Sequence, residues 1–332
     1  MKNQNPHTYS MELFKKITPS MRFDGGDFEK WQNEARAKLN ELLGLPYQKC
    51  DDDFTIEYEE QKDGYREIRF VFQSEEGYYV PCHLLIPEKC AKSRATVICL
   101  QGHSKGMHIS LGAPKYKGDE ATIAGGRDFA LQAVENGYYA LTIEQRDMGE
   151  CGGDETGPRC DVPTKLNLLI GRTTIGERVW DIQRTIDVLE KHFPKEISEY
   201  IICLGNSGGG TATFYAACLE ERIKTAVPSC SVCEFEYSIN LMNHCVCNYI
   251  PNIGKYFNMG DLGGLIAPRN LIVVAGQEDK GFLIEGTKKS YEMIEKLYSY
   301  SSGKCKLLVG NEGHKFYPDL AWPVINKWME ER

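Results

Sequence analysis

One serine of the chain lies in a sequence pattern that is typical of nucleophiles. Residues 205–209 read Gly-Asn-Ser-Gly-Gly and match G-x-S-x-G, and the apolar run 201–204 precedes them. Small residues let a serine occupy a tight turn between a strand and a helix, where the start of the helix favours developing negative charge. The pattern therefore predicts Ser207 as a nucleophile, and a glycine-rich turn without chemistry is the alternative.

The base that this serine needs is predicted from the order of the chain. After such a turn, an acid and then a histidine are expected further along. Only His244 and His314 follow Ser207 among the seven histidines. His244 precedes the apolar strand pattern at 271–275 and breaks the order, whereas His314 follows the strand pattern at 306–309. We predict His314 as the general base, and a surface loop histidine is the alternative.

The acid is expected directly after the strand pattern at 271–275, where Glu278 and Asp279 are neighbours. A carboxylate at this place would hold the imidazole of His314 in the correct tautomer. We predict Asp279, and Glu278 stays open because both carboxylates serve in this role. An Asx turn that ends the strand is the structural alternative.

An oxyanion hole requires two backbone N–H groups. Gly208, the residue after the nucleophile, supplies one of them. The second is expected in the loop after the strand pattern 95–100, which reads Gln-Gly-His-Ser-Lys-Gly over 101–106. We predict His103 as this donor and Gly102 as the residue that shapes the turn. Three roles stay open for the side chain of His103: it forms a wall of the pocket, it makes a polar contact to substrate, or it has no function beyond its place in the loop.

The elements that must position these groups alternate between strand and helix from residue 95 onward. Apolar runs without alternation are typical of strands buried on both faces, and their alternation with helices predicts βαβ crossovers and a mostly parallel sheet. The predicted strands are 95–100, 138–143, 200–204, 223–227, 271–275 and 306–309, and the predicted helices are 129–136, 172–193, 207–219, 283–298 and 320–329.

The first part of the chain has a different pattern of predicted helices and strands. Apolar residues at spacings of three and four predict a helix over 28–43, and three strand-like runs at 54–59, 65–73 and 78–86 with turns between them predict an antiparallel β-meander. We therefore divide the chain into residues 1–90, a helical segment and meander that join the sheet, and residues 91–332, the catalytic core. Three long connections are expected to be functional insertions, at 102–128, 145–171 and 228–268.

Composition restricts the class of protein. The chain has 332 residues, 42% of them hydrophobic and 26% charged, which excludes global disorder. The net charge of −8 disfavours nucleic acid and anionic membranes as partners. Residues 1–10 contain no apolar run of an export signal, so a cytoplasmic location is expected.

Thirteen cysteines are a high number for such a chain. In the expected compartment we interpret them as reduced side chains, most of them buried. Cys230-x-x-Cys233 and His244-Cys245-x-Cys247 lie close together in the sequence, yet the second pair lacks the common spacing of zinc ligands. We expect reduced core or pocket cysteines there, with no metal ion and no organic cofactor.

The chain resembles the α/β-hydrolases, and it is most similar to the branch of acetyl xylan esterase-like and dienelactone hydrolase-related proteins. The resemblance extends over about residues 80–330 and implies a serine hydrolase with a triad of Ser207, Asp279 and His314. Arg146 fits a family position, although the usual glycine after it is replaced by Asp147. The motifs are 205–217, Ala226-Val227-Pro228-Ser229-Cys230, Asn248-Tyr249-Ile250-Pro251, Ala267-Pro268-Arg269, Val274-Ala275-Gly276 and Gly313-His314-Lys315-Phe316-Tyr317.

Two departures from the family weaken any inference of the substrate from the resemblance. Deacetylases of a related group have His-Gly-Tyr where this chain has Gln-Gly-His at 101–103, and dienelactone hydrolases use cysteine where this chain has Ser207. The resemblance implies cleavage of a short acyl ester, most simply acetyl, with acetylated sugars among the expected substrates. A peptidase, a thioesterase and a non-catalytic small-molecule receptor are the alternatives.

The remaining expectations concern the surroundings of the triad. The partner is expected to be a small acyl ester, and a homo-oligomer is possible. The candidate residues of the substrate pocket are Gly102, Asn206, Arg146 and His244.

Overall fold

The continuous apolar runs form parallel strands in the computed structural model, which describes residues 5–89 and 95–332. Within these ranges one sheet of nine strands has the spatial order β1-β2-β3-β5-β4-β6-β7-β8-β9. β1 to β3 are antiparallel, β3 also pairs antiparallel with β5, and the strands beyond β3 are parallel to one another. The predicted sheet with its N-terminal meander is confirmed. The strands are β1 (Thr55–Lys62), β2 (Tyr65–Glu75), β3 (Tyr78–Pro87), β4 (Thr96–Leu100), β5 (Tyr139–Ile143), β6 (Ile201–Asn206), β7 (Ile223–Ser229), β8 (Asn270–Gly276) and β9 (Cys305–Gly310).

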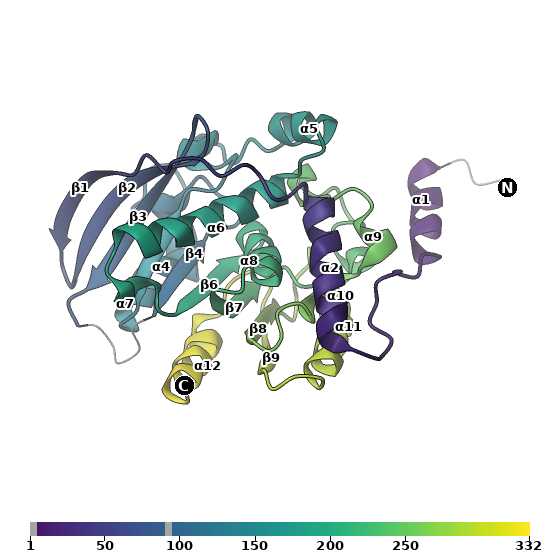
Figure 1. Ribbon diagram of the computed structural model, residues 1–332. Coiled ribbons are helices and arrows are strands. Elements are labelled where there is room, and N and C mark those ends of the chain that lie inside the picture. Colours follow the sequence, from purple (N-terminus) through teal and green to yellow (C-terminus); the bar gives the residue numbers. More distant parts are fainter. Residues whose placement is uncertain (1–4, 90–94) are drawn as a thin grey trace.

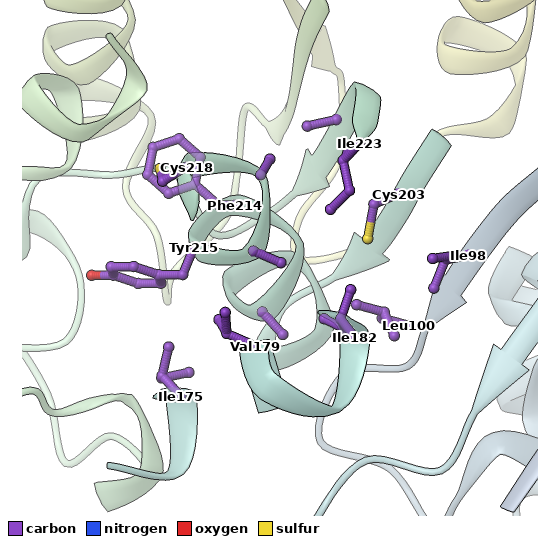
Figure 2. Packing of buried hydrophobic residues seen from close by; sticks show 14 of the residues in the cluster. Ile98, Leu100, Ile175, Val179, Ile182, Cys203, Phe214, Tyr215, Cys218 and Ile223 are labelled. Atoms are coloured by element: carbon purple, nitrogen blue, oxygen red, sulfur yellow. The ribbon is translucent and has the colours of Figure 1, made fainter. Parts of the chain in front are cut away.

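Helices cover both faces of this sheet (Figure 1). Successive side chains of a strand point to opposite faces, so β4 contributes to two separate cores. Ile98 and Leu100 pack with side chains of α2, α6 and α8, as Figure 2 shows for α6 and α8, whereas Val97 and Cys99 pack with side chains of α4 and α12. The helices are α1 (Pro6–Lys15), α2 (Phe28–Leu43), α3 (Asp119–Thr122), α4 (Phe129–Glu135), α5 (Asp161–Leu169), α6 (Thr174–His192), α7 (Lys195–Ser198), α8 (Gly208–Leu219), α9 (Ile253–Tyr256), α10 (Met259–Gly263), α11 (Ile284–Tyr298) and α12 (Pro318–Glu330).

Several helices were not predicted from the sequence. α1 has no buried residue; its start is capped by the side chain of Asn5, with Pro6 at its first position. It lies at the side of the molecule remote from β1 (Figure 1). α5 lies in the predicted insertion 145–171, and α9 and α10 lie in the insertion 228–268.

Two further expectations concern the whole chain. The predicted domain boundary between residues 90 and 91 lies outside the described residues. Within the described ranges, no helix has both the length and the apolar composition that crossing a bilayer requires.

Arg146 is buried among carboxylates, which indicates a structural role in place of the predicted contact with substrate. Its guanidinium is buried and donates hydrogen bonds to Asp181 at 2.8 and 2.9 Å, to Glu177 at 3.0 Å and to Glu75 at 2.6 Å. It also stacks 4.0 Å from the ring centroid of Tyr78. Arg146 therefore ties the loop after β5 to α6 and to the end of β2, because a buried guanidinium requires carboxylates around it.

Replacing Arg146 with glutamine should lower the free energy of unfolding by about 3–5 kcal/mol, because Asp181 and Glu177 would stay buried without their partner. Urea unfolding followed by circular dichroism measures this change. Arg66→Gln is the matched control: Arg66 is half exposed and pairs with Glu59 at 3.3 Å, so its loss should cost less than about 1 kcal/mol. Equal stability changes in the two variants would contradict this role of Arg146.

Candidate active site

Ser207 occupies a strained turn between β6 and α8. Its backbone has φ 56° and ψ −123°, a conformation that side-chain-bearing residues rarely adopt and that costs about 1–3 kcal/mol. The turn is possible because Gly205 has no side chain: a Cβ there would collide with the carbonyl oxygen of Gly209. The amide of Ser207 donates to the carbonyl of Ser229 at 2.8 Å, so the adjacent strand β7 holds the turn.

His314 and Asp279 are joined by a hydrogen bond. Nδ1 of His314 lies 2.7 Å from Oδ2 of Asp279, and the other carboxylate oxygen accepts from the amides of Gly281 and Phe282 at 2.8 and 3.1 Å. Burial raises the pKa of Asp279, but the hydrogen bond and charge of His314 and these two amides outweigh burial and lower the pKa below its usual value. Asp279 therefore stays ionised and orients the imidazole.

The structure distinguishes between the two neighbouring acids. Asp279 is 3% exposed and contacts His314, whereas Glu278 is exposed to solvent. Ser207, Asp279 and His314 follow β6, β8 and β9, whose carboxyl ends lie along one edge of the sheet. Among the described residues no hydrogen bond joins Oγ of Ser207 to the imidazole, and such contacts commonly tighten only when substrate binds.

The predicted oxyanion residues lie beside the serine. Gly208 opens α8, and amides of the first helical turn have no acceptor within their helix. The amide nitrogen of His103 lies 3.7 Å from the place that a Cβ of Gly208 would occupy. A Cβ on Gly102 would lie 3.0 Å from Cβ of Ser207, so the loop after β4 passes directly over the turn. This arrangement can direct two amides at one substrate oxygen.

The other pocket candidates have different positions. His244 is half-buried and meets the rings of His103 and Phe282 edge-on, with centroids 6.3 and 5.7 Å apart. Burial and the two neighbouring histidines lower its pKa, with a hydrogen bond to the carbonyl of Cys245 opposing them. Asn206 is fully buried and accepts a hydrogen bond from Ser229, so it supports the turn and does not line a pocket.

Phe282 is a site residue that the sequence analysis missed. Its ring stacks on His314 with centroids 5.6 Å apart and the planes at 22°. It lies three residues after Asp279 in the same loop, and this proximity in sequence is the signal that could have identified it.

A cleft of about 500 Å³ is lined by His103 and by Lys315, the residue that follows His314. The guanidinium of Arg127 donates to the carbonyl oxygen of His314 at 2.9 Å, and Arg127 therefore links the cleft to the backbone of the triad histidine. Three cationic side chains and one imidazole belong to its lining: Lys105, Arg127, Lys315 and His103.

The loop that carries the oxyanion residues is anchored by a buried acid. Both carboxylate oxygens of Glu144 accept from the amide of Met107 at 3.1 Å, and one also accepts from the amide of Glu150 at 3.3 Å. Burial raises the pKa of Glu144 to about 7, and the hydrogen bonds only partly oppose this shift. Glu144 follows β5, so it connects the loops after β4 and β5.

In the part of the chain that the structure describes, two groups of side chains have the chemistry of metal ligands. One contains Asp279 and His314 of the triad together with Cys230. The second lies beside the loop after β4 and contains His103, Cys160, Cys245 and Cys247.

Comparison with known proteins agrees with this architecture. The model of a family described as the Abhydrolase family matches residues 8–302. The Bacillus subtilis (strain 168) protein named "Putative hydrolase YtaP" is 25% identical over 209 residues, which cover 60% of this chain and 68% of that protein.

Solved structures of esterases share the fold. The structure of a putative acetyl xylan esterase from Bacteroides fragilis NCTC 9343 has a TM-score of 0.79 and 18% identity, covering 99% of this chain and 95% of that one. A glucuronoyl esterase from Solibacter usitatus has a TM-score of 0.69 and 13% identity, covering 95% and 99%. At these identities the likeness shows the fold alone, and the predicted α/β-hydrolase fold is confirmed.

Glu144 should make the stability of the protein depend on pH. The folded protein holds the Glu144 proton up to about pH 7, whereas the unfolded chain releases it near 4.5. The stabilisation is therefore complete below about pH 4.5 and is lost as the pH rises through about 7. As the pH is raised from 5 to 8, the free energy of unfolding of the wild type should fall by about 2 kcal/mol more than that of Glu144→Gln. Identical pH profiles in urea unfolding would contradict this assignment.

Proposed function

Because the chain belongs to the Abhydrolase family, we propose that it is a serine hydrolase that cleaves short-chain acyl esters through Ser207, His314 and Asp279. The observation that carries the proposal is the combination of the strained Ser207 with a His314 that is hydrogen-bonded to a buried Asp279. A protein that only binds a ligand has no need of a strained serine, an oriented imidazole and a buried carboxylate along one edge of its sheet.

The proposed reaction has two steps. His314 takes the hydroxyl proton as Oγ of Ser207 attacks the ester carbonyl, and the amides of Gly208 and His103 stabilise the oxyanion. The bond from the carbonyl carbon to the alcohol oxygen breaks, and His314 gives its proton to the leaving alcohol. Water then attacks the acyl-enzyme with His314 as base, which releases the acid and restores Ser207.

The cavities support a short acyl group and a larger alcohol. A cavity of only about 20 Å³ lies between the first turn of α8 and Phe282, with Thr211 and Ser231 in its lining. This space is much smaller than the cleft and favours a short acyl group over a long chain. The cleft of about 500 Å³ lies beside His103 and is large enough for a sugar-sized alcohol.

The charge of the cleft favours a polar leaving group. Burial lowers the pKa of Arg127, and no carboxylate pairs with Arg127 among residues 5–89 and 95–332. A guanidinium in this position favours hydroxyl or carboxylate oxygens of a ligand. The name of one structural relative, acetyl xylan esterase, is in keeping with an acetylated sugar as the substrate, and the name of another, glucuronoyl esterase, with an ester of a sugar in general.

A series of p-nitrophenyl esters from acetyl to octanoyl tests the proposal. We expect kcat/KM to be highest for acetyl and to fall about tenfold or more for each of the first added methylenes, because the acyl cavity cannot expand without cost. Ser207→Ala should lower kcat by at least about 10³-fold with an unchanged circular dichroism spectrum.

Equal rates for wild type and Ser207→Ala would contradict the serine mechanism. If the wild type cleaves peptides or thioesters but no esters, the protein is a peptidase or a thioesterase. Binding of a small molecule without turnover of any of these substrates would favour a receptor.

The two neighbouring acids provide a matched pair of variants. Asp279→Asn should lower kcat by about 10⁴-fold, because the amide would stabilise the wrong tautomer of His314. Glu278→Gln changes an exposed side chain and should stay within about twofold of the wild type. Steady-state kinetics on the acetyl ester distinguishes them, and a larger loss in Glu278→Gln would refute the assignment of Asp279.

A further inference from the structure

Four metal-ligating side chains from three segments meet beside the loop after β4. His103 belongs to that loop, Cys160 directly precedes α5, and Cys245 and Cys247 flank the start of a short 3-10 helix (Val246–Asn248). Their four ligand atoms all lie within 4.8 Å of one another. Nε2 of His103 lies 3.0 Å from Sγ of Cys247, and the sulfurs of Cys245 and Cys247 are 3.3 Å apart.

These spacings suit a tetrahedral metal ion. Zinc binds thiolate sulfur at about 2.3 Å and imidazole nitrogen at about 2.0–2.1 Å, which places ligand atoms of a tetrahedron about 3.6–3.8 Å apart. The observed separations, 3.0 and 3.3 Å at the short end and 4.8 Å as the upper limit, span this range. One histidine and three cysteines are also a common ligand set of closed structural zinc sites.

A buried cation next to the sulfurs requires negative charge there. The side chain of Arg178 is 0% exposed, and its two terminal nitrogens lie 3.6 Å from the sulfurs of Cys247 and Cys160. The carboxylate of Asp147 lies 3.9 Å away, beyond hydrogen-bond distance. The sulfurs are the nearest acceptor side chains of Arg178, and thiolates there would supply the compensating charge.

Metal binding would place the required negative charge on the sulfurs. A thiolate is the form of cysteine that binds metal ions. Three thiolates would be neutralised by one divalent ion together with the guanidinium of Arg178.

We propose that His103, Cys160, Cys245 and Cys247 bind one zinc ion in a closed, four-coordinate site. This proposal departs from the sequence-based expectation of no metal. Cys230 and Cys233, which the sequence places near Cys245, lie outside the cluster: their thiols donate to the carbonyls of Lys315 and of Tyr237 and Leu283.

A disulfide is the competing use of these sulfurs, and the geometry favours the metal. A bond between two of the cysteines would leave the third sulfur and Nε2 of His103 without a role. It would also remove two of the sulfurs that supply negative charge to Arg178. The zinc site uses all four ligands and keeps that charge.

The ion would position the loop that carries a predicted oxyanion amide. His103 would be tied to the start of α5 and to the insertion 228–268, which would fix the loop over the turn at Ser207. The site has no open coordination position, so His103 and the cysteines are positioning residues in this proposal.

Metal content of the full chain tests the site. Protein purified under reducing, metal-free conditions is loaded with Zn²⁺, desalted and measured by inductively coupled plasma mass spectrometry. We expect about one zinc per chain in the wild type and at least tenfold less in Cys160→Ser and Cys245→Ser. Cys305→Ser, which changes a half-buried thiol on β9 outside the cluster, should retain the full amount.

Co²⁺ binding to the wild-type chain tests the metal site even if the variants do not fold. Tetrahedral thiolate coordination produces sulfur-to-cobalt charge-transfer absorption and intense visible d–d bands, which added Zn²⁺ should abolish. The proposal is overturned if the wild type retains no zinc and shows no such bands. It is also overturned if Cys305→Ser loses as much metal as Cys245→Ser, or if mass mapping finds a disulfide between cysteines of the cluster in place of the metal.

Discussion

The positive φ of Ser207 is the constraint on which the site depends. A serine adopts φ 56° only where the surroundings over-determine the backbone, and here β6 and α8 are buried on both sides of the turn. Gly205 allows the close approach, and Ser229 on β7 accepts the amide of the strained residue. The turn directs the hydroxyl away from the sheet and presents the amide of Gly208 beside it. The remaining loops of the site are arranged around this point.

Three guanidiniums near the site show how burial decides the role of a charge. Arg146 is surrounded by the carboxylates of Glu75, Glu177 and Asp181, so it is structural. Arg178 is fully buried with sulfurs as its nearest acceptor side chains, which points to thiolates and to a metal. Arg127 holds the carbonyl of His314 and faces the cleft, so its charge is available to a ligand. The same residue type thus serves stability at Arg146 and, in our proposals, metal binding at Arg178 and substrate recognition at Arg127.

The sequence sufficed for features that depend on local pattern. Continuous apolar runs predicted the parallel strands, and the order of residues after those strands predicted Ser207, Asp279 and His314. It could not distinguish Asp279 from Glu278, because that choice depends on which of two adjacent carboxylates is buried against His314. The structural contacts of Arg146 could not be predicted, since two of its partners, Glu75 and Asp181, belong to elements distant in sequence. The cluster of His103 with Cys160 was not recognised for the same reason.

Covalent labelling of the intact chain by a fluorophosphonate tests the central claim most directly. Such a probe reacts with a serine only when a neighbouring base activates its hydroxyl. Mass spectrometry of the digested protein should find a single adduct, on Ser207, and the adduct should be absent in His314→Ala. Labelling of another residue, or equal labelling of Ser207 without His314, would contradict the account.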